Sequence, residues 1–136
     1  MPESNQSGEH IVRAYDEQLD NLTAMVTRMG GLAETQLAAA IRAVLQRDSE
    51  LAHKVVAGDE QIDDLDQEID GAVIRLLALR QPMAVDLRAV LTALRISADL
   101  ERVGDYAKNV AKRALVLNQE HVTAPADGIR RMGEIA

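Results

Sequence analysis

The chain has 136 residues, which suits one domain with a hydrophobic core, and 47% of its residues are apolar. It contains no Phe, Trp or Cys, so its core must be aliphatic, and disulfides, thiolate metal sites and cysteine nucleophiles are excluded. The formal net charge of −7 argues against nucleic-acid binding and against direct adhesion to anionic lipid, and it is compatible with a bound cation or a basic protein partner.

No apolar run reaches the roughly 18 residues that a membrane-spanning helix requires. The polar start of the chain has neither the basic nor the apolar segment of a signal peptide. We therefore expect a cytoplasmic protein without direct membrane insertion, in which residues 1–9 form a disordered tail.

The apolar residues from about His10 to Gln46 recur every three or four positions, which predicts one long amphipathic helix. Gly30 and Gly31 lie inside it, either as a tolerated weak point or as a flat spot where another helix approaches closely. The predicted seam consists of Ile11, Tyr15, Leu19, Leu22, Val26, Met29, Ala33, Leu37, Ile41 and Val44.

A second helical arm follows, and it is predicted to be broken. Asp48 and Ser49 have the character of a helix N-cap. We expect a short helix to end at Gly58, because glycine commonly terminates helices. A further helix is then predicted from about Glu60 to Arg80, and Gln81-Pro82 should end it.

The third long helix is predicted from Pro82 to about Leu117. Its first half is apolar on nearly all sides, as is typical of a helix at the centre of a bundle. Short connections between the three arms predict antiparallel neighbours. The expected fold class is therefore all-α: an antiparallel three-helix bundle at residues 10–118 with long first and third helices and a broken second arm, followed at 119–136 by a linker and the start of another helix.

Two pairs of carboxylates share one spacing, Asp59 with Asp63 and Glu101 with Asp105. Residues four apart lie on one face of a helix, so each pair repels unless a base or a bound cation compensates it. Carboxylates on adjacent helices supply the hard oxygen ligands that suit magnesium, calcium, manganese or iron. Two simpler interpretations stay open: these acids are helix caps or a solvated face, and Lys108 pairs with Asp105.

No other constellation in the sequence indicates catalysis. Of the three histidines, His53 alone follows a Glu, Glu50, by three positions, whereas ferritin-type di-iron bundles use this spacing on two helices, so a buried redox site is not expected. No Ser-His-Asp grouping, Gly-rich phosphate loop or basic phosphate-binding cluster is suggested. We expect a protein that is not an enzyme. The alternatives are a carboxylate-bound metalloenzyme, such as a hydrolase that uses a metal-activated water, and a metal-free structural helical bundle.

Several of these segments together resemble the PhoU family of bacterial phosphate-signalling regulators. The segments are Leu100-Glu-Arg-Val-Gly-Asp105, the preceding Arg80-Gln-Pro-Met-Ala-Val-Asp-Leu-Arg88, Met29-Gly-Gly-Leu32, and Gly58-Asp59 followed by Ile62-Asp63. The resemblance runs from about His10 to Leu115. It implies a fold of two three-helix repeats, of which this chain is similar to the first repeat and the opening turns of the second.

The resemblance also implies a function. Family members are non-enzymatic adaptors between the ATPase subunit of a phosphate ABC transporter and a sensor histidine kinase, and they restrain the phosphate-starvation response. A homodimer in the cytoplasm, peripheral to the inner membrane through its partners, is implied here. In some members surface motifs bind metal ions, and those motifs match Asp59/Asp63 and Glu101/Asp105. The metal implied is iron, zinc, manganese or magnesium.

Overall fold

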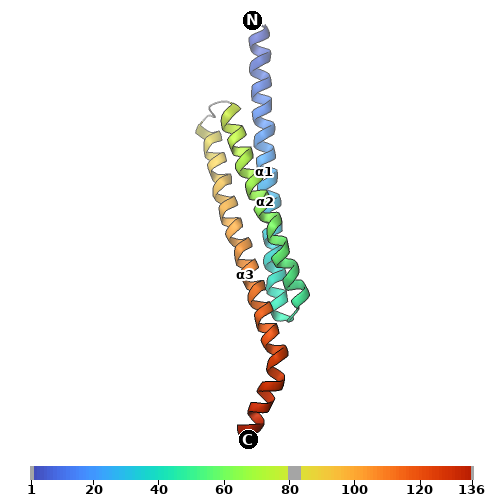
Figure 1. Ribbon diagram of the computed structural model, residues 1–136. Helices are drawn as coiled ribbons and strands as arrows, with labels where there is room; N and C mark the ends of the chain where they lie inside the picture. Colours follow the sequence, from blue (N-terminus) through green and yellow to red (C-terminus); the bar gives the residue numbers. More distant parts are fainter. Residues whose placement is uncertain (1, 80–83, 136) are drawn as a thin grey trace. The chain divides into compact units, whose positions relative to one another are not determined.

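In a computed structural model of the chain, three α-helices follow one another: α1 (Pro2–Leu45), α2 (Ser49–Leu79) and α3 (Ala84–Ile135) (Figure 1). The structure describes the backbone of residues 2–79 and 84–135 and the side chains of residues 13–78 and 87–120. Within these ranges every regular element is an α-helix, which confirms the predicted all-α fold. None of the described helices has a stretch that is both long and apolar enough to cross a membrane.

The turn between α1 and α2 serves both helices. Arg47 adopts a left-handed backbone with φ 53°, and the amide of Asp48 donates to the carbonyl oxygen of Ala43 at 3.0 Å. This is the Schellman arrangement that satisfies the last carbonyls of a helix. The carboxylate of Asp48 then accepts a hydrogen bond of 3.0 Å from the amide of Leu51. The predicted N-cap at this position is therefore confirmed.

The predicted break of the second arm at Gly58 is wrong, because α2 continues through this residue. No described glycine has a positive φ, so Gly58 keeps a helical backbone. Its missing side chain makes room instead: a Cβ atom there would lie 2.9 Å from Nε2 of Gln36. The Gln36 amide donates a hydrogen bond of 2.6 Å to the carbonyl oxygen of Val55. Gly58 thus lets a side chain of α1 reach the backbone of α2.

The helices extend further at both ends than the sequence predicts. α1 begins at Pro2, within the residues expected to form a disordered tail. α3 continues to Ile135, and so covers residues 119–135 of the range 119–136 in which we expected a linker and a new helix. No Gly or Pro lies between Leu117 and Pro125, but α3 also continues through Pro125 and Gly128, which helix propensity does not predict. The predicted helix end at Gln81-Pro82 lies outside the described residues.

The helices pack as two units, and each unit contains one segment of every helix, side by side (Figure 1). The first unit comprises Met1–Ala33 and Glu60–Arg102. Its largest fully buried side chains are Leu22, Met29, Ile62, Ile69, Leu76 and Val90. The second unit comprises Glu34–Asp59 and Val103–Ala136. Its core is mostly alanine: Ala40, Ala43, Ala52, Val55, Ala107, Ala111 and Ala114.

The predicted seam of α1 is largely correct in the first unit, where Leu19 and Val26 are half-buried and the Ile11 side chain lies outside the described residues, and it shifts in the second unit. Tyr15, Leu22 and Met29 are buried as expected. In the second unit the larger Ile41 and Val44 are 47% and 39% exposed, and Ala40 and Ala43 are buried instead. Small side chains let helix axes approach more closely, so the alanine face packs inward and the larger residues turn outward.

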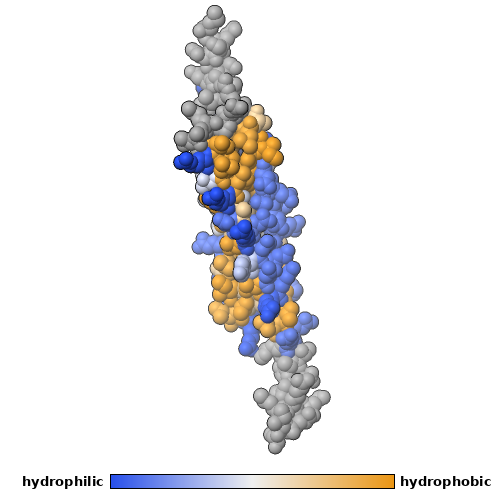
Figure 2. All heavy atoms as spheres, turned by 90° about the vertical axis from the view of Figure 1, so that its left-hand side faces the viewer, coloured by the Kyte–Doolittle hydropathy of each residue, from blue (hydrophilic) through white to orange (hydrophobic). Residues whose placement is uncertain are grey.

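The first half of α3 is not fully enclosed, although its composition predicts a central helix. Val90 is buried, whereas Leu87, Leu91 and Ile96 are 40%, 56% and 42% exposed. Only three helix segments share the first unit, so a helix that is apolar all round must leave part of that surface in solvent. The face drawn in Figure 2 displays hydrophobic side chains beside strongly hydrophilic ones.

Two glycine substitutions test whether Gly58 is needed to make room for the Gln36 side chain. A Cβ atom at Gly31 would meet nothing within 4 Å. Gly31→Ala should therefore raise the free energy of unfolding by about 0.5–1 kcal/mol through helix propensity alone. Gly58→Ala should give no comparable gain, because the new methyl group displaces Gln36 and weakens a hydrogen bond worth about 1 kcal/mol. Urea unfolding followed by circular dichroism measures both, and equal gains would show that Gln36 does not constrain Gly58.

Candidate metal centre

The sequence predicts four carboxylates at one site, and the structure places them in different environments. Asp59 is buried at 2% exposure on α2, and Asp63 lies one turn further along the same uninterrupted helix and is half-buried. On α3, Glu101 is half-buried and Asp105 is exposed. The cluster therefore contains both a buried acid, Asp59, and an acid exposed to water, Asp105.

Three of these acids form a group that could hold a metal ion. Asp59, Asp63 and Asp105 each offer one carboxylate oxygen, and these oxygens lie within 4.8 Å of one another. Glu101 precedes Asp105 by one turn and is not a member of this group. The i,i+4 spacing on α2 thus leads to a shared site, whereas the same spacing on α3 brings only its second member into the group.

Lys108 pairs with the buried acid of the cluster. Its Nζ atom lies 3.5 Å from Oδ2 of Asp59, and the Lys108 side chain is 33% exposed while that of Asp59 is 3% exposed. The interpretation that Lys108 pairs with Asp105 on its own helix is not supported. A desolvated carboxylate needs a counter-charge far more than a solvated one does, so the buried acid gains most from the lysine.

The other oxygen of Asp59 has no partner among the described groups. Oδ1 is buried and accepts no hydrogen bond there. A buried acceptor left unsatisfied costs about 1–3 kcal/mol, so such an atom in a folded protein calls for an explanation. An oxygen of this kind, beside two further carboxylates, fits a hard cation such as Mg²⁺, Ca²⁺ or Mn²⁺.

Other acids of α2 have separate environments. Oδ1 of Asp66 accepts a hydrogen bond of 3.4 Å from the hydroxyl of Ser97, which is 2% exposed. Ser97 also donates to the carbonyl oxygen of Leu94 at 3.2 Å. Asp64, Glu68 and Asp70 are exposed, as expected for a solvated face. Sequence reasoning missed the roles of Lys108 and Ser97, because both depend on which residues face each other across two helices.

Comparison with known proteins assigns the chain to a family. The model of the PhoU domain matches residues 26–114, a span that contains all four predicted carboxylates. The chain belongs to the PhoU family. The family resemblance inferred from the sequence motifs is therefore confirmed.

Relatives within the PhoU family are similar over most of this chain. The phosphate-specific transport system accessory protein PhoU homolog of Caulobacter vibrioides (strain NA1000 / CB15N) is 55% identical over 128 residues, which are 93% of this chain and 56% of that protein. PhoU of Escherichia coli (strain K12) is 39% identical over 114 residues, 83% of this chain and 47% of that protein.

A solved structure has the same fold. The crystal structure of PhoU from Pseudomonas aeruginosa matches with a TM-score of 0.76 and 40% identity, over 78% of this chain and 51% of that one. The chain spans about half the length of the relatives it matches.

Removal of the lysine from the Asp59–Lys108 pair should destabilise the fold. In buffer with a chelator, Lys108→Met should lower the free energy of unfolding by about 1–3 kcal/mol, because it leaves a buried charge uncompensated. Adding Asp59→Asn should recover part of the loss, since a neutral amide needs no counter-charge. Lys112→Met, on an exposed side chain of the same helix, is the matched control and should change stability by less than about 0.5 kcal/mol. Equal effects of the two lysine substitutions would contradict the pairing.

Proposed function

We propose that this PhoU-family chain is a regulatory adaptor of phosphate uptake, which acts by binding other proteins and not by catalysis. The similar proteins from Caulobacter vibrioides and Escherichia coli are named as accessory proteins of the phosphate-specific transport system. In our proposal the partners are the ATPase subunit of the phosphate ABC transporter and a sensor histidine kinase, and the protein restrains the phosphate-starvation response as a negative regulator. It works in the cytoplasm as a homodimer, held at the inner membrane by its partners.

The proposal includes a metal ion at the acidic cluster, and the observation that carries it is the buried carboxylate of Asp59. One oxygen of this group faces Lys108, and the other has no partner among the described atoms. Asp63 and Asp105 supply the nearest further oxygens, and we propose Glu101 as a fourth, outer ligand. The all-oxygen donor set suits magnesium or manganese, with iron or zinc as the other candidates.

Lys108 and the metal ion compete for Asp59 in this proposal. Both are positive charges that compensate the same desolvated carboxylate. A bound dication would weaken the ion pair between Lys108 and Asp59, and Lys108 would lower the affinity of the site for the dication. The site is therefore tuned to weak, reversible binding rather than to a permanently held structural metal.

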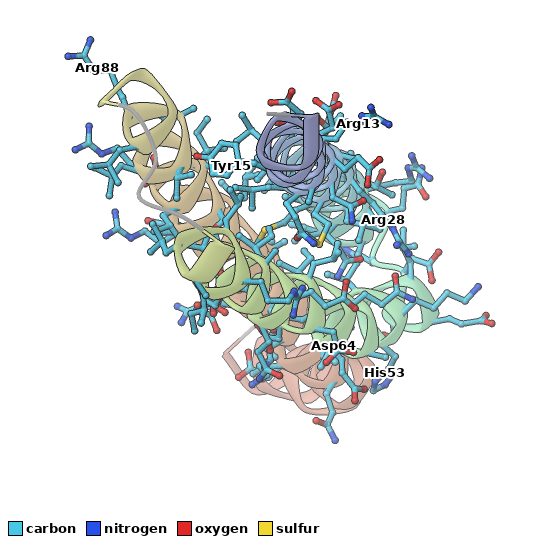
Figure 3. The ribbon with its side chains drawn as sticks, turned by 90° about the horizontal axis from the view of Figure 1, so that it is seen from above. Arg13, Tyr15, Arg28, His53, Asp64 and Arg88 are labelled. Atoms are coloured by element: carbon cyan, nitrogen blue, oxygen red, sulfur yellow. The ribbon has the colours of Figure 1, made fainter. Side chains whose placement is uncertain are left out.

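Metal binding can be measured by calorimetry with Mn²⁺ and with Mg²⁺. Asp105→Asn, at an exposed position, should weaken binding by more than about tenfold, since even the loss of an outer-shell partner costs 10- to 100-fold. Glu101→Gln should weaken it by a smaller factor, and Lys108→Met should strengthen it. Asp64→Asn is the matched control, because Asp64 is an exposed acid of α2 outside the cluster (Figure 3). Equal losses from Asp64→Asn and Asp105→Asn would refute the assigned ligands.

The adaptor role predicts direct binding to the purified ATPase subunit and to the cytoplasmic part of the kinase. Cells that lack the protein should express phosphate-starvation genes even in high phosphate, and the full-length protein should restore repression. Biolayer interferometry and a promoter reporter measure these two outcomes. Turnover of a generic phosphoester by the metal-loaded chain would instead favour the hydrolase alternative. Dimers that a chelator does not affect, together with no binding to either partner, would favour the structural bundle.

A further inference from the structure

The first unit contains an open groove that the acidic cluster does not use. It lies between α1 and α3 and has a volume of about 540 Å³. Thr23, Val26 and Thr27 line it on α1, and residues from Arg88 to Ile96 line it on α3. The α3 wall extends over about 12 Å of helix axis, at 1.5 Å per residue. The groove therefore matches the length of about two turns of a further helix.

The surface of the groove is less polar than its composition implies. Each of its threonines donates its hydroxyl proton to a carbonyl oxygen one turn earlier in its own helix. The distances are 3.1 Å from Thr23 to Leu19, 2.9 Å from Thr27 to Thr23 and 2.8 Å from Thr92 to Arg88. With these donors engaged, the threonines present mainly their methyl groups. Together with Val26, Ala93 and the exposed Ile96, they give the groove an apolar floor.

The charged groups at the two edges of the groove differ in sign. Arg88 lines the α3 edge, and Arg95 follows it seven residues later on the same helix face. Both are exposed, and neither guanidinium forms an ion pair with any described side chain. On α1 the exposed Asp20 precedes Thr23 by three residues and so shares its face. In a chain of net charge −7, two exposed arginines without an ion pair among the described side chains make the α3 edge of this apolar groove suited to an acidic partner.

We propose that this groove binds an amphipathic helix of a protein partner, with its apolar face on Val26, Ala93 and Ile96 and acidic side chains toward Arg88 and Arg95. Helices dock into apolar grooves through residues spaced three, four and seven apart. Arginine suits such an edge, because its guanidinium binds carboxylates through two parallel hydrogen bonds.

Other occupants fit the groove less well. A small anion such as phosphate needs several converging donors, and among the described residues that line the groove only Arg88 is charged. An anionic membrane would be repelled by the net charge of −7 and by Asp20. The inference does not depend on which protein supplies the helix, so it stands apart from the transporter and kinase partners proposed above.

The probe is a synthetic helical peptide of about 16 residues, long enough to cover the groove at 1.5 Å per residue. It carries leucines along one face and glutamates along one edge, and a second peptide has lysine in place of each glutamate. The glutamate peptide should bind the intact chain by fluorescence anisotropy and shift the amide NMR signals of Val26 and Ala93. The double variant Arg88→Glu with Arg95→Glu should weaken this binding by at least about tenfold and should bind the lysine peptide instead.

Two controls separate the groove from general electrostatics. Arg28→Glu removes an exposed arginine of α1 that points away from α3 (Figure 3), so it should leave the affinity within about twofold. Ala89→Trp, at an exposed position in the groove, should abolish binding without loss of helicity.

Three results would overturn the proposal. These are no binding of the glutamate peptide, NMR shifts outside the groove, and an equal effect of Arg28→Glu. Arginine-dependent binding to phosphatidylserine vesicles without peptide binding would likewise replace the helix with a membrane surface.

Discussion

A carboxylate with almost no exposed surface must be compensated wherever its helix places it, and in this chain Asp59 meets that need with Lys108. The pair joins α2 to α3 within the second unit, where the core around it is mostly alanine. Alanine buries little apolar area per residue, so each position contributes less to stability than Leu or Ile does in the first unit. A charge pair that holds two such helices in register therefore contributes a larger share of the stability there than it would in a core of large side chains.

The same pair supports the proposal that the acidic cluster binds a cation reversibly. Lys108 satisfies one oxygen of Asp59 and leaves the other without a described partner, next to Asp63 and Asp105. In the proposed site, Lys108 compensates one oxygen of Asp59 and a cation would bind the other. In a member of the PhoU family, such a site would let the ionic content of the cell alter the contact between two helices. The proposed metal site is built of carboxylates, and the proposed groove is edged by arginines. The first would bind a cation and the second an acidic helix, so the two sites would not compete for one ligand.

Much of this molecule follows from residue spacing, and the rest depends on contacts between helices. The burial of Tyr15, Leu22 and Met29 on α1 and the cap at Asp48 were predictable, because both depend only on neighbours along one helix. That Asp59 and Asp63 lie on one face of α2 was predictable for the same reason. The pairing of Lys108 was not, since the register between α2 and α3 decides it. Gly58 was misassigned because glycine both ends helices and makes room for neighbours, and only the position of Gln36 distinguishes the two.

In the proposed metal site, a cation and Lys108 compete for the buried carboxylate of Asp59. Anomalous diffraction from crystals soaked in Mn²⁺ tests it most directly, because it locates the ion and the lysine together. Competition should give a manganese peak about 2.0–2.6 Å from carboxylate oxygens of Asp59, Asp63 and Asp105, with the Lys108 ammonium moved away from Asp59. No peak at these residues, with Lys108 still 3.5 Å from Asp59, would contradict it.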